Sequence, residues 1–168
     1  NAIKIARRFT GRSEIICFEG AFHGRSYMTM AMTSKCKPYK TGFGPLPQGV
    51  NRFPFPYCYR CPHKLERETC GLHCLKRFEE SYFLEYVAPD QVAAIILEPV
   101  LGEGGFIVPP QEYMKGLREL CDKYGILLIA DEIQAGYART GKMFGCEYWG
   151  VKPDIVVSAK SVAGGIPV

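Results

Sequence analysis

The chain has 168 residues, which is enough for one domain with a substantial hydrophobic core. Its net charge of +4 is small and its Lys and Arg residues are scattered, so composition gives no case for a nucleic-acid partner. No run of about 18 apolar residues indicates a membrane span, and the opening residues lack the hydrophobic core of a signal peptide. We therefore expect a cytoplasmic protein with neither a membrane nor a nucleic-acid partner.

The first third of the chain predicts two short helices and one strand. Apolar residues at positions 2, 3, 5, 6 and 9 form a helical stripe in "NAIKIARRF". The apolar run "EIICFE" (14–19) predicts a strand, and "GRSYMTMAMTS" (24–34) predicts a short helix. Residues 37–62 are rich in Pro, Gly and aromatic side chains, and so predict a long loop.

The rest of the chain alternates helices and apolar strands. Residues 71–87 and 111–125 have helical spacing, and Gly125 is a stop signal for the second helix. The runs "VAAIIL" (92–97), "ILLIA" (126–130) and "DIVVS" (154–158) predict buried strands. Continuous apolar strands separated by helices predict an α/β fold with a mostly parallel sheet covered by helices on both faces.

Polar and aromatic side chains follow each predicted strand. In open α/β sheets, ligands bind outside the carboxyl ends of the strands, where this sequence has Phe22, His23, Arg25, Glu98, Asp131 and Lys160. A Lys amine can form a Schiff base with the aldehyde of pyridoxal phosphate (PLP), and an Asp can pair with the pyridine nitrogen of that cofactor. The residues therefore suit a PLP site.

Asp131 is followed by a second acid, Glu132, and both close a strand that is expected to be buried. A carboxylate at the edge of an apolar core costs free energy unless a cation or a hydrogen-bond donor meets it. We expect an ordinary partner, such as Arg139 or a helix N-terminus, or else a ligand.

Four ordered motifs carry a resemblance to a known family. "FHGRS" (22–26), "EPVLGEGG" (98–105), "DEIQAGYARTGK" (131–142) and "PDIVVSAKSVAGGIP" (153–167) resemble the class-III, ornithine/4-aminobutyrate-type aminotransferases. The resemblance implies the type I PLP-dependent transferase fold. It also implies that residues 1–168 are part of the PLP-binding large domain, with a Cys/Pro-rich insertion at about 50–75 and without the small C-terminal domain.

The resemblance also implies a role for each site residue. Lys160 would be the catalytic residue and would carry the cofactor. Asp131 would hold the pyridine nitrogen and Gln134 the 3-oxygen, with Phe22 and Ile133 on opposite ring faces and His23 nearby. Arg25 would bind a substrate carboxylate, Glu103 would act as a gating acid, and Glu98 would support the site electrostatically.

The activity implied is transamination from a 4-aminobutyrate- or ornithine-like donor to a 2-oxo acid acceptor, by a protein that is a homodimer at full length. An amino-acid racemase or an aminomutase would need the same Lys160 and Asp131. The chain looks cut at both ends, so we expect residues 1–168 alone to have little or no activity. The sequence departs from the family pattern at Ser26, at Leu101 and in "QAGYAR" (134–139), where Ala138 replaces Gly and matters if its backbone needs a positive φ. The last two departures concern substrate fit more than cofactor binding.

Two pairs of cysteines stand apart from these motifs. Cys58 and Cys61 form C-x2-C, and Cys70 and Cys74 form C-x3-C, which are spacings found in structural zinc sites. His63 and His73 lie beside them as further possible ligands. We prefer reduced, packed thiols and no metal, and the alternative is a non-catalytic domain clipped by zinc.

Overall fold

The computed structural model describes residues 1–166. One sheet contains five strands in the order β2-β1-β3-β4-β5. The strands are β1 (Glu14–Phe18), β2 (Val50–Phe53), β3 (Val92–Leu97), β4 (Leu127–Asp131) and β5 (Ile155–Val157). Every neighbouring pair is parallel, which confirms the predicted sheet. Within residues 1–166, no helix is long and apolar enough to cross a membrane.

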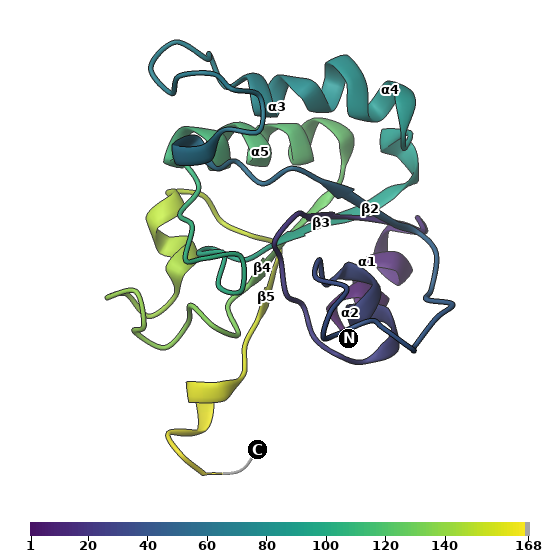
Figure 1. Cartoon of the computed structure of the whole chain (residues 1–168), viewed down its shortest axis with the longest axis vertical. Coiled ribbons are helices and arrows are strands. Elements are labelled where there is room, and N and C mark those ends of the chain that lie inside the picture. Colours follow the sequence, from purple (N-terminus) through teal and green to yellow (C-terminus); the bar gives the residue numbers. More distant parts are fainter. Residues whose placement is uncertain (167–168) are drawn as a thin grey trace.

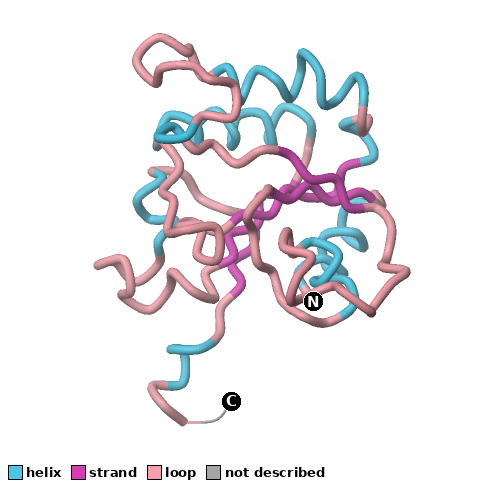
Figure 2. The backbone as a smooth tube through the Cα atoms, viewed as in Figure 1, coloured by secondary structure: helices cyan, strands magenta, loops and turns pink. Residues whose placement is uncertain are grey.

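Helices cover both faces of this sheet (Figure 1). On one face lie α3 (His73–Arg77), α4 (Phe83–Glu85) and α5 (Gln111–Tyr124), and on the other lie α1 (Ala2–Thr10) and α2 (Tyr27–Met32). Figure 2 shows the strands as a central twisted band, with long loops gathered around it. Sheet and helices therefore form the three layers that an α/β sequence predicts.

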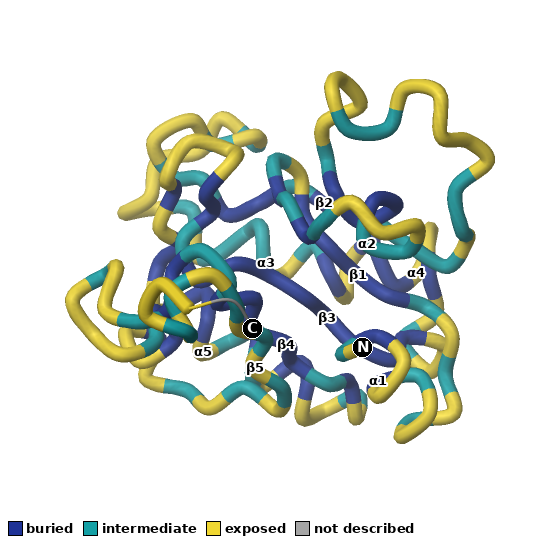
Figure 3. Tube along the Cα trace, turned by 90° about the horizontal axis from the view of Figure 1, so that it is seen from below, coloured by how far each residue is buried: buried dark blue, intermediate teal, exposed yellow. Residues whose placement is uncertain are grey.

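The central strands explain why their sequences read as continuous apolar runs. All six residues of β3 are buried, and Figure 3 shows β1, β3 and β4 as the buried centre of the molecule. Burying one Ile or Leu side chain stabilises the fold by about 1.5–3 kcal/mol, and here both faces of the strand contribute. A strand buried on both faces has no polar side and so shows no alternation.

The two longer helices differ in how fully their apolar stripes are covered. In α5, Met114, Leu117 and Cys121 are fully buried, and Gly125 ends the helix with φ 63°, as predicted. In α1, Ile3 and Ala6 are buried. Two further apolar side chains of α1 remain exposed, Ile5 by 57% and Phe9 by 78%.

The prediction of one uninterrupted loop over residues 37–62 is wrong, because β2 lies inside it. The sequence of β2, Val-Asn-Arg-Phe, has no apolar run, since this edge strand is only partly buried along most of its length. Phe53 anchors it by stacking on Tyr82 with the ring centroids 4.0 Å apart. That contact joins distant parts of the chain, so local sequence could not reveal it.

The predicted helix over 71–87 is confirmed in outline but is not one regular helix. Between α3 and α4 the chain makes a wider π-helical turn at Phe78–Tyr82. This turn buries Phe78 and Tyr82 together against the sheet side of the layer. Irregular turns of this kind depend on packing rather than on spacing.

Candidate functional site

The carboxyl ends of β4 and β5 bring Asp131 and Lys160 to the same edge of the sheet. Asp131 is paired with Val157 in the ladder, and the N–H of Glu132 donates to the carbonyl of Val157 at 2.8 Å. Lys160 follows shortly afterwards and opens a 3₁₀ turn, Lys160–Ala163. The parallel register therefore brings Asp131 and the end of β5, which leads to Lys160, to the same edge of the sheet.

Lys160 and Gln134 share one cavity of about 400 Å³, which is in the size range of small-molecule sites. Its remaining lining comes from Val100, Gly102, Phe106, Ala135, Arg139 and Thr140. A Cβ at Gly102 would lie 1.7 Å from Oε1 of Gln134, so the Gln134 amide would have to move if this position carried a side chain. Lys160 and Gln134, which the family resemblance assigns to the cofactor, therefore line the same cavity.

The backbone of Lys160 is in the left-handed region, with φ 56°. For a residue with a Cβ this conformation costs roughly 1–2 kcal/mol. Such strain persists where surrounding structure enforces it, and it is concentrated at functional sites. Among residues 1–166, five other non-glycine residues share a positive φ, so the cavity rather than this conformation distinguishes Lys160.

Asp131 is held by His23. The His23 Nδ1 and Asp131 Oδ2 atoms are 2.8 Å apart, and both side chains are buried. The other carboxylate oxygen, Oδ1, accepts the N–H of Ile133 at 3.2 Å. The Nε2 atom of His23 is buried without a partner in the described structure. His23 therefore orients Asp131, a role that the sequence pattern did not reveal.

Glu132 has a different and purely structural environment. Its oxygens accept the N–H groups of Gly145 at 2.9 Å and Cys146 at 2.7 Å, at the start of the 3₁₀ helix Gly145–Trp149. The expected helix N-terminus is thus the partner of Glu132. Arg139 partners neither acid and instead reaches Ser161 Oγ at 3.5 Å.

Glu98 joins the ends of β1 and β3. Its carboxylate accepts the N–H of Phe22 at 2.9 Å and that of Gly102 at 3.0 Å. Burial is the largest influence on Glu98 and raises its pKa, while these two hydrogen bonds oppose the rise. Arg25, which has no ion-pair partner among residues 1–166, lies over the ring of Tyr39, with Cζ 5.1 Å from the centroid.

The glycine-rich stretch after β3 (102–105) forms a turn, closed by a bridge between Leu101 and Ile107. The turn leaves Glu103 on the surface, where Oε2 lies 3.1 Å from Tyr39 Oη and 3.5 Å from Lys35 Nζ. Tyr39 also packs its ring 4.8 Å from that of Phe22. No sequence signal pointed to Tyr39 or Lys35, because both sit in a loop without periodicity.

The predicted residues thus form neighbouring groups rather than one cluster. Within the described structure, Lys160 and Gln134 line the cavity, His23 and Asp131 pair beneath the surface, and Phe22, Arg25 and Glu103 meet around Tyr39. Ile133 is half-buried and touches Asp131 through its backbone. An amine, an amide and an oriented carboxylate at one sheet edge are a donor set that fits PLP.

The departure at Ala138 has a structural consequence. Its φ is 65°, and that of Tyr137 is 59°, so this backbone does need positive φ. Glycine adopts this region at no steric cost, whereas alanine does not. Leu101, another departure, is buried at 2% exposure and a Cβ on Gly20 would lie 3.0 Å from it, so it serves packing here.

The cysteine segment (residues 58–74) follows β2. Cys58, Cys61, Cys70 and Cys74, together with His63 and His73, line one small cavity of about 20 Å³. All four thiols are free, and no group of three possible ligands among residues 1–166 is arranged to hold a metal. Burial, and after it the neighbouring thiols, raise the pKa of Cys74 to about 11. Burial also raises the pKa of the Cys58 thiol, so the neutral form of Cys58 and Cys74 is favoured.

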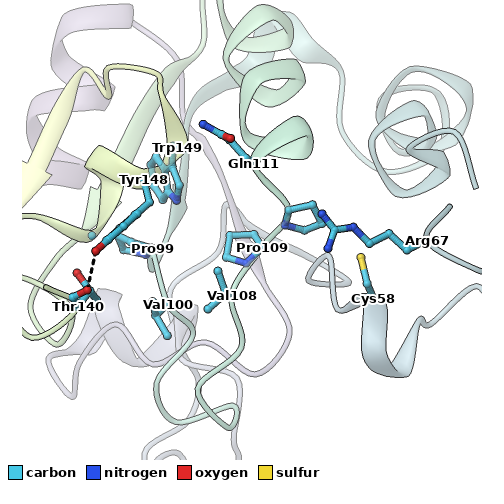
Figure 4. Close-up of a pocket in the computed structure, with 12 residues that line it drawn as sticks. Cys58, Arg67, Pro99, Val100, Val108, Pro109, Gln111, Thr140, Tyr148 and Trp149 are labelled. Atoms are coloured by element: carbon cyan, nitrogen blue, oxygen red, sulfur yellow. Dashed lines mark hydrogen bonds between the residues drawn. The ribbon is translucent and has the colours of Figure 1, made fainter. Parts of the chain in front are cut away.

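A larger groove of about 590 Å³ lies between this segment and the residues before β5. Figure 4 shows Tyr148 and Trp149 at one end and Cys58 with Arg67 at the other, and prolines and valines between them. None of the predicted site residues lines it. The sequence motifs, and not cavity size, therefore point to the cavity at Lys160 and Gln134.

The parallel sheet and the polar side chains at its carboxyl edge define an α/β protein with a ligand site at the ends of its strands. The family model of the class-III aminotransferases matches residues 1–168. The chain therefore belongs to the class-III aminotransferase family.

Relatives and a solved structure agree with this assignment. The chain is 45% identical over 168 residues to a probable 4-aminobutyrate aminotransferase of Bacillus subtilis, and 48% identical over 168 residues to the 5-aminovalerate aminotransferase of Pseudomonas putida. In both cases 100% of this chain covers 38% of the relative. An amine transaminase from an uncultivated Pseudomonas species, solved in its PLP-bound form, is 36% identical with a TM-score of 0.89, over 98% of this chain and 38% of that one.

Proposed function

We propose that the whole protein is a PLP-dependent aminotransferase. It transfers an amino group from a 4-aminobutyrate- or ornithine-like donor to a 2-oxo acid. The observation that carries this proposal is the cavity that Lys160 and Gln134 share, at the sheet edge where His23 orients Asp131. The named activities of the similar proteins from Bacillus subtilis and Pseudomonas putida support the same reaction and the same kind of donor.

In this proposal each residue at the edge has one task toward the cofactor. Lys160 holds the cofactor through Nζ, and the same amine then moves a proton at the substrate carbon. Asp131 keeps the ring nitrogen protonated, and Gln134 donates a hydrogen bond to the 3-oxygen. Phe22 and Ile133 flank the ring, and His23 positions Asp131. When it is bound, PLP supplies an electron sink for the substrate carbon.

The substrate side of the proposal rests on charge. Arg25 binds the carboxylate at the far end of the donor, because a guanidinium forms two parallel hydrogen bonds with a carboxylate. Glu103 is the gating acid, and Glu98 contributes negative charge close to the site. Together they fit a donor with an amine at one end and a carboxylate at the other.

The wider protein is also part of the proposal. The chain spans about 38% of the length of its curated relatives. We infer that residues 1–168 form the central part of a large cofactor-binding domain, that the full-length protein is a cytoplasmic homodimer, and that this part alone is inactive. A racemase or an aminomutase remains the alternative, because it would use the same Lys160 and Asp131.

The experiment uses the full-length protein loaded with PLP. With 5-aminovalerate alone, an aminotransferase retains one amino group per site and releases one equivalent of the donor's oxo product, whereas a racemase or an aminomutase releases none. Lys160→Ala should lower turnover by at least about 10²–10⁴-fold, since it removes both the cofactor link and the proton carrier. Lys152→Ala, a change at another exposed lysine of the same segment, is the matched control. Normal turnover by Lys160→Ala would refute the proposal.

A further inference from the structure

We propose that Tyr39 is a positioning residue that sets the preference of this site for donors with a distal carboxylate. The inference rests on the proposed function, because it concerns the same substrate end. It starts from a contact pattern: Tyr39 touches Phe22, Arg25 and Glu103, three residues from separate segments of the chain. In the described structure it is the side chain that links the ring-flanking residue, the guanidinium and the gating acid.

The ring of Tyr39 fixes Arg25. The guanidinium carbon lies 5.1 Å from the ring centroid, within the range of a cation–π interaction. Arg25 is exposed, and among residues 1–166 no carboxylate lies within ion-pair distance of it. An aromatic face holds the cation without using its N–H groups. The N–H groups of Arg25 therefore stay available for the carboxylate of a substrate.

The hydroxyl of Tyr39 fixes Glu103. It donates to Oε2 at 3.1 Å, and Lys35 Nζ approaches the same oxygen at 3.5 Å. A free carboxylate at Glu103 would compete with the substrate carboxylate for Arg25. Tyr39 contacts Arg25 through its ring and Glu103 through its hydroxyl, and so keeps the guanidinium and the carboxylate apart.

The loop that carries Tyr39 is anchored close to the site. Nη2 of Arg52, in β2, donates to the carbonyls of Ala31 at 2.7 Å and Thr33 at 3.1 Å, at the end of α2. The Ser34 N–H donates to the carbonyl of Ala21 at 2.7 Å. These bonds hold the start of the loop against the ends of β1 and α2. Further along this loop, the ring of Tyr39 packs against that of Phe22.

Two substitutions separate the ring from the hydroxyl. Tyr39→Phe keeps the ring beside Phe22 and Arg25 but releases Glu103, and Tyr39→Ala removes both contacts. Tyr59→Phe is the matched control, because Tyr59 is 84% exposed in the cysteine segment. The full-length, PLP-loaded variants are assayed with 5-aminovalerate and with pentylamine, an amine of the same length without a carboxylate. Binding of valerate, which lacks the amine, is measured in parallel by calorimetry.

For Tyr39→Phe we expect KM for 5-aminovalerate and Kd for valerate to rise by about 5–10-fold, where tenfold equals about 1.4 kcal/mol. The kcat for 5-aminovalerate and the kinetics with pentylamine should stay within about twofold of wild type. Tyr39→Ala should show a larger rise for the same two ligands. Tyr59→Phe should match wild type.

Equal losses with 5-aminovalerate and pentylamine would overturn the inference, since they would show only a general structural role. Unchanged KM and Kd in Tyr39→Ala would overturn it as well, and so would a wild-type protein that binds no valerate. Selective loss of valerate binding in a protein that transaminates neither amine would refute the proposed function and leave the role of Tyr39 intact.

Discussion

The carboxyl edge of the sheet and the cysteine segment both contain several titratable side chains, but the two regions differ in the hydrogen-bond donors that meet these side chains. At the sheet edge, Glu98, Asp131 and Glu132 are buried, and each accepts hydrogen bonds at 2.7–3.2 Å. In the cysteine segment, four thiols and two imidazoles surround a space of about 20 Å³. In the first region backbone N–H groups meet buried carboxylates, whereas in the second burial raises the pKa of the Cys58 and Cys74 thiols.

This difference shows how much of a site depends on the supply of backbone donors. Parallel strands end together, so N–H groups from following turns converge on the acids there. Two such donors offset the free-energy cost of burying a carboxylate, which without them would be on the order of several kcal/mol. The cysteine segment is a loop with no comparable row of donors, and thiols tolerate that because they are weakly polar.

The largest expected effect comes from removing an acid at the sheet edge. Glu132→Ala should lower the free energy of unfolding by about 3–5 kcal/mol, because the buried N–H groups of Gly145 and Cys146 would lose a charged acceptor. Urea unfolding of the full-length protein measures the loss. Glu147→Ala is the control, since its exposed carboxylate accepts one N–H, that of Phe144 at 2.8 Å. Equal stability of the two variants would contradict the comparison.

A smaller effect concerns pH. Burial raises the pKa of Glu98 above its ordinary value of 4.5, so the folded state binds this proton more tightly than the unfolded state does. The contribution of Glu98 to stability is therefore lost as pH rises from 4.5 through the folded pKa. Measured against Glu98→Gln over this range, wild type should lose stability as pH rises. A difference between the two proteins that does not change with pH would show that the carboxyl is not perturbed.

The smallest expected effect tests the cysteine segment. If its thiols are neutral packing groups, a chelator should leave the melting temperature unchanged. Cys74, with a pKa of about 11, should be alkylated slowly at pH 8 and faster as the pH approaches that value. Exposed Cys36 is the internal reference for peptide mapping of the alkylated protein. A melting temperature that falls with chelator, and zinc at one equivalent per chain, would establish the zinc alternative instead.

Much of the candidate site could be predicted because its residues directly follow predicted strands. Asp131 and Glu98 come immediately after apolar runs, and parallel strands must end at one edge, so their proximity follows from topology. The pairing of His23 with Asp131 could not be predicted, since either of two ring nitrogens could have met several acceptors. Tyr39 escaped notice because it lies 17 residues after Phe22 (39 − 22) in a loop without periodicity, so that tertiary packing rather than local spacing decides which aromatic ring reaches Phe22.

The sequence by itself determined the parallel α/β layers, the cofactor lysine candidate Lys160 and the family, because apolar runs and ordered motifs are local properties of a chain. Tertiary structure alone decided that Val50–Phe53 joins the sheet edge, that Glu132 serves a helix start while Asp131 faces His23, and that Tyr39 joins Arg25 to Glu103. These contacts form between groups that are distant in the sequence and lie within about 3–5 Å of each other in the fold. They follow from the packing of whole layers, so no short segment of the sequence predicts them.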